Sequence, residues 1–98
     1  MVEKSVVKIA VDPHKRINAV VAVGATGSVL ARATFAQSTT GFADLMGFAR
    51  RWPRREWAIE GATGVGKNLA QRLVVKGETV FDVPSKKSSL VRAFSATS

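Results

Sequence analysis

Two short apolar stretches of this sequence each end in a carboxylate. Val6–Val11 precedes Asp12, and Trp57–Ile59 precedes Glu60. Both stretches are too short for an ordinary helix, and the first is rich in β-branched residues, so we interpret them as buried strands. Acids that follow strands of an open α/β sheet lie at its carboxyl edge, where such folds place their sites. Two such strands side by side would bring Asp12 and Glu60 together.

A pair of carboxylates suits a hard divalent cation, because Mg²⁺ prefers oxygen ligands. Metal ions that several acids hold about 3.5–4 Å apart assist phosphodiester cleavage. We therefore expect a site for Mg²⁺ or Mn²⁺ at Asp12 and Glu60, weak or incomplete with these two acids alone. The alternative, which the spacing leaves equally open, is that both are ordinary solvated acids. His14 could be a ligand or proton shuttle beside Asp12, but positioning a loop is its more common role.

The glycine-rich loop after Glu60 fits a phosphate-binding pattern only in part. Gly61–Lys67 matches G-x-x-x-x-G-K between a strand and a helix. Asn68 stands where that loop needs a hydroxyl for Mg²⁺, and Glu60 would direct a negative charge at the phosphates. We therefore favour a packing role, in which the glycines let the loop turn close to neighbouring backbone.

The chain is strongly basic. It has 15 Lys and Arg residues against 7 Asp and Glu, a net charge of +8, which favours nucleic acid or another polyanion as partner. The densest cluster, Arg50–Arg55, could contact phosphates, or it could end a helix with Trp52 packed beneath it. The residues that we expect to contact nucleic acid are Lys15, Arg16, Arg50, Arg51, Arg54, Arg55, Lys67, Lys86 and Lys87.

The composition excludes several classes of protein. A length of 98 residues predicts one domain, and the absence of cysteine excludes disulfides and thiolate metal sites. No apolar run approaches the roughly 20 residues of a membrane span. We find no secretory signal, and we expect a cytoplasmic protein without a membrane partner.

The elements that must position these residues follow the order β-β-β-α-β-α-β-α. Short connections make the first three strands an antiparallel meander, and strand–helix–strand units make the later pairings parallel. The third strand alternates in polarity and is expected at a sheet edge. Thr39 or Thr40 caps the first helix, and Gly77 ends the second. The expected strands cover 6–11, 17–23, 28–35, 55–60 and 79–83, and the helices cover 41–52, 67–76 and a stretch after Pro84.

Two blocks of the sequence, and the distance between them, carry a family resemblance. The first block is Ile9–Lys15 with the apolar strand after it and Ala25–Gly27. The second is Trp57–Gly64 with Leu69 and Gly77–Pro84. In order and spacing these blocks resemble the DEDD-type insertion-sequence transposases, over nearly the whole chain.

This resemblance implies an α/β fold of the ribonuclease-H-like, RuvC-like kind. That fold is a mixed five-stranded sheet with three antiparallel strands, then parallel strands, and helices on its faces. By resemblance, Asp12 and Glu60 are the first two of four catalytic, metal-binding acids, with Mg²⁺ or Mn²⁺ as cofactor. The family's last two aspartates follow later, so residues 1–98 are expected to be a single truncated domain that is inactive alone. The implied partners are DNA and, in the full-length family, a structured guide RNA.

The preferred interpretation is the N-terminal fragment of a DNA transposase or recombinase catalytic domain, whose family cleaves and transfers DNA strands in transposition. One alternative is a non-catalytic nucleic-acid-binding module of the same fold. Another is a nucleotide-binding fragment of the actin or sugar-kinase kind, because that fold also begins with a meander and an acid on its first strand. An unpaired strand edge and the apolar residues Leu90, Val91 and Phe94 predict a homodimer.

Overall fold

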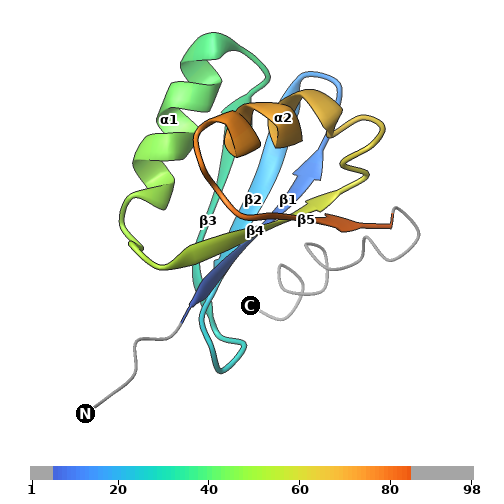
Figure 1. The fold of residues 1–98 in the computed structure, drawn as a ribbon. Coiled ribbons are helices and arrows are strands. Elements are labelled where there is room, and N and C mark those ends of the chain that lie inside the picture. Colours follow the sequence, from blue (N-terminus) through green and yellow to red (C-terminus); the bar gives the residue numbers. More distant parts are fainter. Residues whose placement is uncertain (1–5, 85–98) are drawn as a thin grey trace.

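A computed structural model describes residues 6–84 of the chain, which form one mixed sheet and two helices (Figure 1). The third helix expected after Pro84, with Lys86 and Lys87, lies outside the described residues. No helix within 6–84 is long and apolar enough to cross a membrane. In chain order the elements are β1 (Val7–Pro13), β2 (Ile17–Val23), β3 (Val29–Ala36), α1 (Thr39–Ala49), β4 (Arg55–Glu60), α2 (Lys67–Val75) and β5 (Val80–Val83).

The sheet has the strand order β3-β2-β1-β4-β5. β1 pairs antiparallel with β2, and β2 pairs antiparallel with β3. β1 pairs parallel with β4, and β4 pairs parallel with β5. The mixed five-stranded sheet predicted from the sequence is therefore confirmed, and β3 lies at an edge as expected. The most continuously apolar strands, β1 and β2, lie inside the sheet, because both of their faces need covering.

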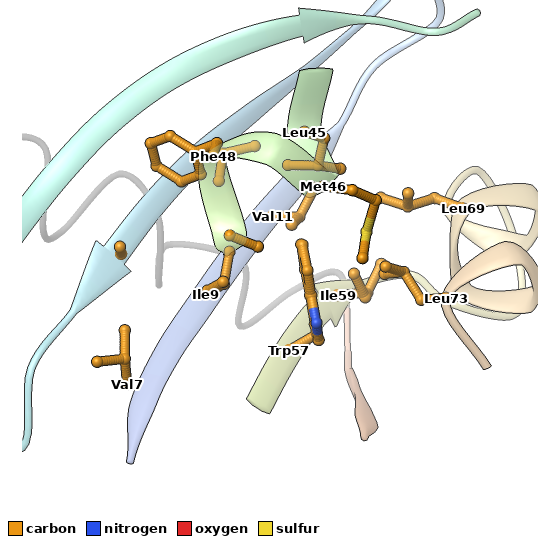
Figure 2. Close-up of a cluster of buried hydrophobic side chains, with 13 residues drawn as sticks. Val7, Ile9, Val11, Leu45, Met46, Phe48, Trp57, Ile59, Leu69 and Leu73 are labelled. Atoms are coloured by element: carbon orange, nitrogen blue, oxygen red, sulfur yellow. The ribbon is translucent and has the colours of Figure 1, made fainter. Parts of the chain in front are cut away.

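Both helices cover the same face of the sheet (Figure 1). Alternate residues of β1 and β4, among them Val11, Trp57 and Ile59, point into the core beneath them. Leu45 of α1 and Leu73 of α2 complete that core, and all five are completely buried (Figure 2). The helices are held by this apolar contact, since each presents one apolar side at helical spacing.

The opposite face of the sheet carries a smaller buried cluster. Ala10, Val21 and Val23 form it, with Val29 packed against them. The register between β2 and β3 shifts at Ala22 and Val23. This shift turns Val29 to the second face of the sheet, whereas the other apolar residues of β3 face the helices. Asp12 and Glu60 share the strand parity of Ala10, so they belong to this second face at the strand ends.

Helix α1 begins and ends earlier than predicted. Its N-cap is Ser38, whose Oγ accepts a hydrogen bond from the Gly41 N–H at 3.0 Å, and neither Thr39 nor Thr40 caps it. An extended backbone at Ser38 lets its hydroxyl reach that free amide. The helix ends at Ala49, before Trp52.

The end of α2 follows the prediction that Gly77 caps it. The Gly77 N–H donates to the Val74 carbonyl, and the Glu78 N–H donates to the Leu73 carbonyl. These two bonds, with φ +85° at Gly77, are a Schellman motif. The motif turns the chain sharply and places Glu78 immediately before β5.

Candidate functional site

The carboxyl ends of the parallel strands β1, β4 and β5 meet at one edge of the sheet. This edge runs across the strand ends and not along an outer strand. Figure 1 shows the β1–β2 turn and the Gly61–Gly66 loop together at this edge. The parallel register pairs Val11 with Ile59, and one further step along both strands reaches Asp12 and Glu60. Neighbouring strands lie about 4.8 Å apart, and in register their side chains share a face. The structure therefore places Asp12 and Glu60 next to each other.

The two acids have different surroundings. The Asp12 side chain is 20% exposed, and His14 Nε2 lies 3.1 Å from its Oδ2. Oε1 of Glu60 is shielded from solvent. β1 extends beyond the predicted end at Val11 because its pairing with β2 continues to Pro13 and Asn18, and the His14 N–H then donates to the Ile17 carbonyl at 2.8 Å. Pro13 stands at a non-hydrogen-bonded position of this ladder, so its missing N–H is not needed for pairing with β2. Asp12 is thus held inside a paired strand, and His14 stands beside it in the turn.

The donor chemistry of this pair fits one hard divalent cation. Asp12 and Glu60 offer carboxylate oxygens, and Mg²⁺ commonly keeps several waters as its other ligands. Within residues 6–84 no three His, Asp or Glu side chains lie close enough to hold a metal ion. The nearest further acid on the adjacent strand, Asp82, has the opposite parity to Glu60 and accepts a hydrogen bond from the Ala62 N–H at 2.9 Å. A cation here would have two protein ligands from the described residues.

The glycine loop after β4 is a compact turn. The N–H groups of Gly64 and Gly66 donate to the Gly61 carbonyl, and the Lys67 N–H donates to the Gly64 carbonyl. A Cβ at Gly66 would lie 2.8 Å from Ile59 Cγ2, so only glycine lets the loop pack so closely against β4. These internal bonds use amides that a phosphate-binding loop would direct at its ligand, which supports the packing role.

The predicted nucleic-acid-binding residues fall into two groups. Lys15 and Arg16 lie in the β1–β2 turn and Lys67 begins α2, all at the edge that carries the acids. Arg50, Arg51 and Arg54 lie between α1 and β4, at the opposite edge. β4 has 6 residues at about 3.3 Å each, which puts roughly 17–20 Å between the two edges.

Arg55 is engaged inside the fold. Its Nε and Nη2 atoms bond Glu78 at 3.0 and 2.7 Å, and its Nη1 donates to the carbonyls of Ala49 and Trp52. The Trp57 indole also donates to Glu78, at 2.7 Å. Arg55 therefore fastens the end of α1 and the start of β4 to the segment after α2.

Trp52 and Arg51 combine packing with exposed charge. Trp52 packs edge-on against Phe48 with ring centroids 5.2 Å apart. The Arg51 guanidinium lies 4.9 Å from the centroid of Phe48 and 5.4 Å from that of Trp52. The packed tryptophan expected in one interpretation of this cluster is present, and its arginines at 50, 51 and 54 remain exposed.

Sequence reasoning missed a pocket at the same edge of the sheet as the acid pair, on the face that the helices cover. It has a volume of about 590 Å³ and lies between the β1–β2 turn, the start of α1 and one side of α2. Asn18, Gln37 and Arg72 line it, and none of them was a predicted site residue. The spacing of Val65, Asn68, Leu69 and Arg72 marks one helical face, but only the fold places the β1–β2 turn opposite that face.

Comparison of the chain with protein-family models and with curated proteins gives no match. The site is therefore characterised by its own geometry. That geometry is an acid pair on adjacent parallel strands, a histidine against one acid, and a polar pocket with cationic residues alongside.

Proposed function

We propose that this chain is the N-terminal part of a DNA transposase or recombinase catalytic domain of the DEDD type, with a ribonuclease-H-like fold. The observation that carries the proposal is the placement of Asp12 and Glu60 at adjacent carboxyl ends of β1 and β4. The antiparallel meander followed by parallel strands supports it, because that order agrees with the fold the resemblance implies.

Asp12 and Glu60 are the residues proposed to hold Mg²⁺ or Mn²⁺. When bound, such an ion activates an attacking oxygen and neutralises charge on a phosphodiester. His14 orients the Asp12 carboxylate through their 3.1 Å contact. Lys15, Arg16 and Lys67 attract the phosphate backbone to the same edge, since cations near the site raise the local concentration of DNA.

The partners in this proposal are DNA and, in the full-length family, a structured guide RNA. A homodimer and a cytoplasmic location stay predictions; the outer strand β3 offers the edge that such a dimer would use. We assign Arg55 a structural role, because the partly buried Glu78 carboxylate and two carbonyls already engage its guanidinium. Arg50, Arg51 and Arg54 stay candidates for contacts with nucleic acid.

A second candidate is a nucleic-acid-binding module of the same fold in which Asp12 is structural. The Asp12–His14 contact and the cationic turn favour it, since neither needs a metal. The nucleotide-binding interpretation has less support, because the amides of the Gly61–Gly66 loop bond within the loop.

Thermal melts with chelator and with metal distinguish the first two candidates. If the pair binds a cation with a dissociation constant near 1 mM, about 10 mM metal adds about 1.4 kcal/mol of stability. For a domain of this size the melting temperature then rises by about 5–10 °C. We expect that rise in the parent chain and its loss in Asp12→Asn. Without metal Asp12→Asn should be at least as stable as the parent, because it removes one of two adjacent like charges.

Asp82→Asn is the matched control. It removes a carboxylate from the same sheet edge but from the other face, and the amide oxygen can still accept the Ala62 hydrogen bond. This variant should keep the full metal response. An Asp12→Asn chain that is clearly destabilised, together with a parent that ignores metal, would overturn the metal site in favour of the binding module.

A further inference from the structure

The pocket at the carboxyl edge of the sheet has walls from several elements. Its volume of about 590 Å³ falls within the range of about 300–1,000 Å³ for ligand sites. Lys15 and Asn18 come from the β1–β2 turn and β2, Gln37 from the segment before α1, and Asn68 and Arg72 from α2. The residues of the pocket wall include no Asp or Glu. A pocket with cations and amides but no acid attracts anions.

Its two strongest cations carry no ion pair within residues 6–84. In that part of the chain, Lys8 pairs with Glu56, and Arg55 pairs with Glu78. Lys15 and Arg72 have no such acid, and both are exposed at the pocket. Their charges are therefore available to a ligand without breaking an internal ion pair.

The pocket is held in shape by contacts among its own residues. The Arg72 guanidinium lies 5.1 Å from the Phe42 ring centroid, a cation–π contact that fixes its direction. Gln37 Nε2 donates to the His14 carbonyl at 2.9 Å and to Asn18 Oδ1 at 2.8 Å. These bonds tie the end of β3 to the β1–β2 turn before any ligand binds.

Asn18 is a buried polar residue on this wall. It is 3% exposed, and Oδ1 is the atom that accepts the bond from Gln37. Its Nδ2 group remains as the donor of this side chain, with no acceptor among residues 6–84. The Nδ2 atom is not among the buried atoms that lack a partner, so it remains accessible, and an accessible amide donor beside two cations is suited to an oxygen of a phosphate group.

We propose that this pocket binds a phosphodiester group of a nucleic-acid strand, with Lys15, Arg72 and Asn18 as its donors. The proposal deepens the function proposed above and depends on nucleic acid being the partner. A shallower hollow of about 400 Å³ continues from Phe42, Asn68 and Arg72 towards Lys76. A strand whose phosphate occupies the pocket can therefore extend along the side of α2, where Lys76 is the next cation.

His14 connects the pocket with the acid pair. It lines the pocket, its carbonyl accepts the Gln37 bond, and its Nε2 contacts Asp12. A strand anchored in the pocket would thus lie at the same edge as Asp12 and Glu60, with the pocket on the helix-covered face and the acids on the other face. The pocket is a positioning site, because its donors contact the backbone of the strand and not the acids.

The test is binding of a fluorescent 20-nucleotide single strand to the whole chain, with chelator present, at several salt concentrations. Arg72→Gln should weaken binding about tenfold and reduce the salt slope by about 0.7, the value for one phosphate contact on a single strand. Arg32→Gln removes the same charge from the exposed side of β3, outside the pocket, and it should change affinity less than twofold. Arg72→Lys keeps the charge but not the planar guanidinium, so its affinity should lie between the affinities of these two variants.

Amide NMR supplies a direct readout of the pocket. The Asn18 side-chain amide should shift on addition of the oligonucleotide to the parent and should stay unshifted in Arg72→Gln. Equal losses in Arg72→Gln and Arg32→Gln, with no Asn18 shift, would mean that net charge alone drives binding, and would overturn the proposal. An Asn18 shift with inorganic phosphate but none with the oligonucleotide would make the pocket a small-anion site, and would overturn it too.

These outcomes are separate from those of the metal test. Because chelator is present, a chain without a metal response can still bind a strand through Arg72, and only the transposase proposal then fails. If the chain responds to metal but Arg72→Gln does not weaken binding, only the proposal for the pocket fails.

Discussion

Glu78 and Arg55 form a network of hydrogen bonds that links three segments of the described chain. Their side chains are 11% and 16% exposed, and the guanidinium bonds both carboxylate oxygens. Burial by itself raises the pKa of Glu78, but the hydrogen bonds from Arg55 and Trp57 and the Arg55 charge outweigh burial. The net effect is a pKa below the ordinary carboxyl value, so Glu78 stays ionised in the folded chain.

This lowered pKa predicts how stability depends on pH. A carboxyl with a lower pKa in the folded state stabilises the fold fully above its ordinary pKa, near 4.3. That contribution is lost as pH falls through the folded value. We expect Glu78→Gln to lower the free energy of unfolding at pH 7 by about 3 kcal/mol, because it leaves Arg55 without its carboxylate. The difference from the parent should narrow as pH falls below about 4.

Urea denaturation at pH 7, 5 and 3 measures this difference. Glu56→Gln is the control, because its ion pair with Lys8 is more exposed than that of Glu78 with Arg55 and should be worth at most about 1 kcal/mol. A Glu78→Gln chain no less stable than Glu56→Gln at pH 7 would contradict the prediction.

Residue types and their local order indicated Asp12 and Glu60, since each directly follows a buried apolar run. The role of Arg55 could not be predicted in the same way. Its partner Glu78 is distant in sequence and comes close only through the pairing of β4 with β5 and the Schellman turn. The same reason hid Arg72 and Asn18, whose pocket depends on how α2 packs beside the β1–β2 turn.

At the scale of elements, apolar patterns predicted the strands better than the helix ends. β2 and β4 have the predicted bounds, because turn residues or charged residues flank a clear apolar run in each. The start of α1 was misplaced because Ser38, Thr39 and Thr40 are all capable caps. Which of them caps the helix depends on where β3 ends and the chain leaves the sheet. The local sequence alone does not determine that point.

Two glycines of α1 give a test of that packing. Gly41 is buried in the first turn, and a Cβ there would overlap the Ala36 carbonyl oxygen of β3. We expect Gly41→Ala to destabilise the chain by roughly 2–3 kcal/mol, because the helix must shift away from the strand. Gly47, in the same helix, has nothing within 4 Å of its Cβ position. Gly47→Ala should stabilise by about 1 kcal/mol through helix propensity.

Chemical denaturation of both variants checks this pair. If Gly41→Ala were as stable as the parent, the close contact between α1 and β3 would be wrong. If both substitutions stabilised the chain, helix propensity alone would decide the stability of α1, without the constraint from β3.

At the scale of the whole molecule, charge and acids are distributed unevenly. The net charge is +8, and exposed cations lie at both edges of the sheet. Of the acids within residues 6–84, only Asp12 and Glu60 are placed together at the carboxyl ends of adjacent strands. Most of the others described have separate roles or positions: Glu56 pairs with Lys8, Glu78 pairs with Arg55, and Asp82 accepts the Ala62 amide.

This distribution predicts a chain that binds DNA without cutting it. Neutralising several phosphates gives a salt slope of about −0.9 per duplex contact, so affinity should fall steeply as salt rises. Cleavage with two ions needs more carboxylates than Asp12 and Glu60, because each ion requires several oxygen ligands in fixed geometry. Supercoiled plasmid incubated with a saturating amount of this chain and Mg²⁺ or Mn²⁺ should therefore remain supercoiled. Nicking that depends on metal and disappears in Asp12→Asn would contradict this, because it would mean that two acids suffice for the reaction. Nicking that persists in Asp12→Asn would instead reveal a contaminating nuclease, since that variant lacks half of the proposed acid pair.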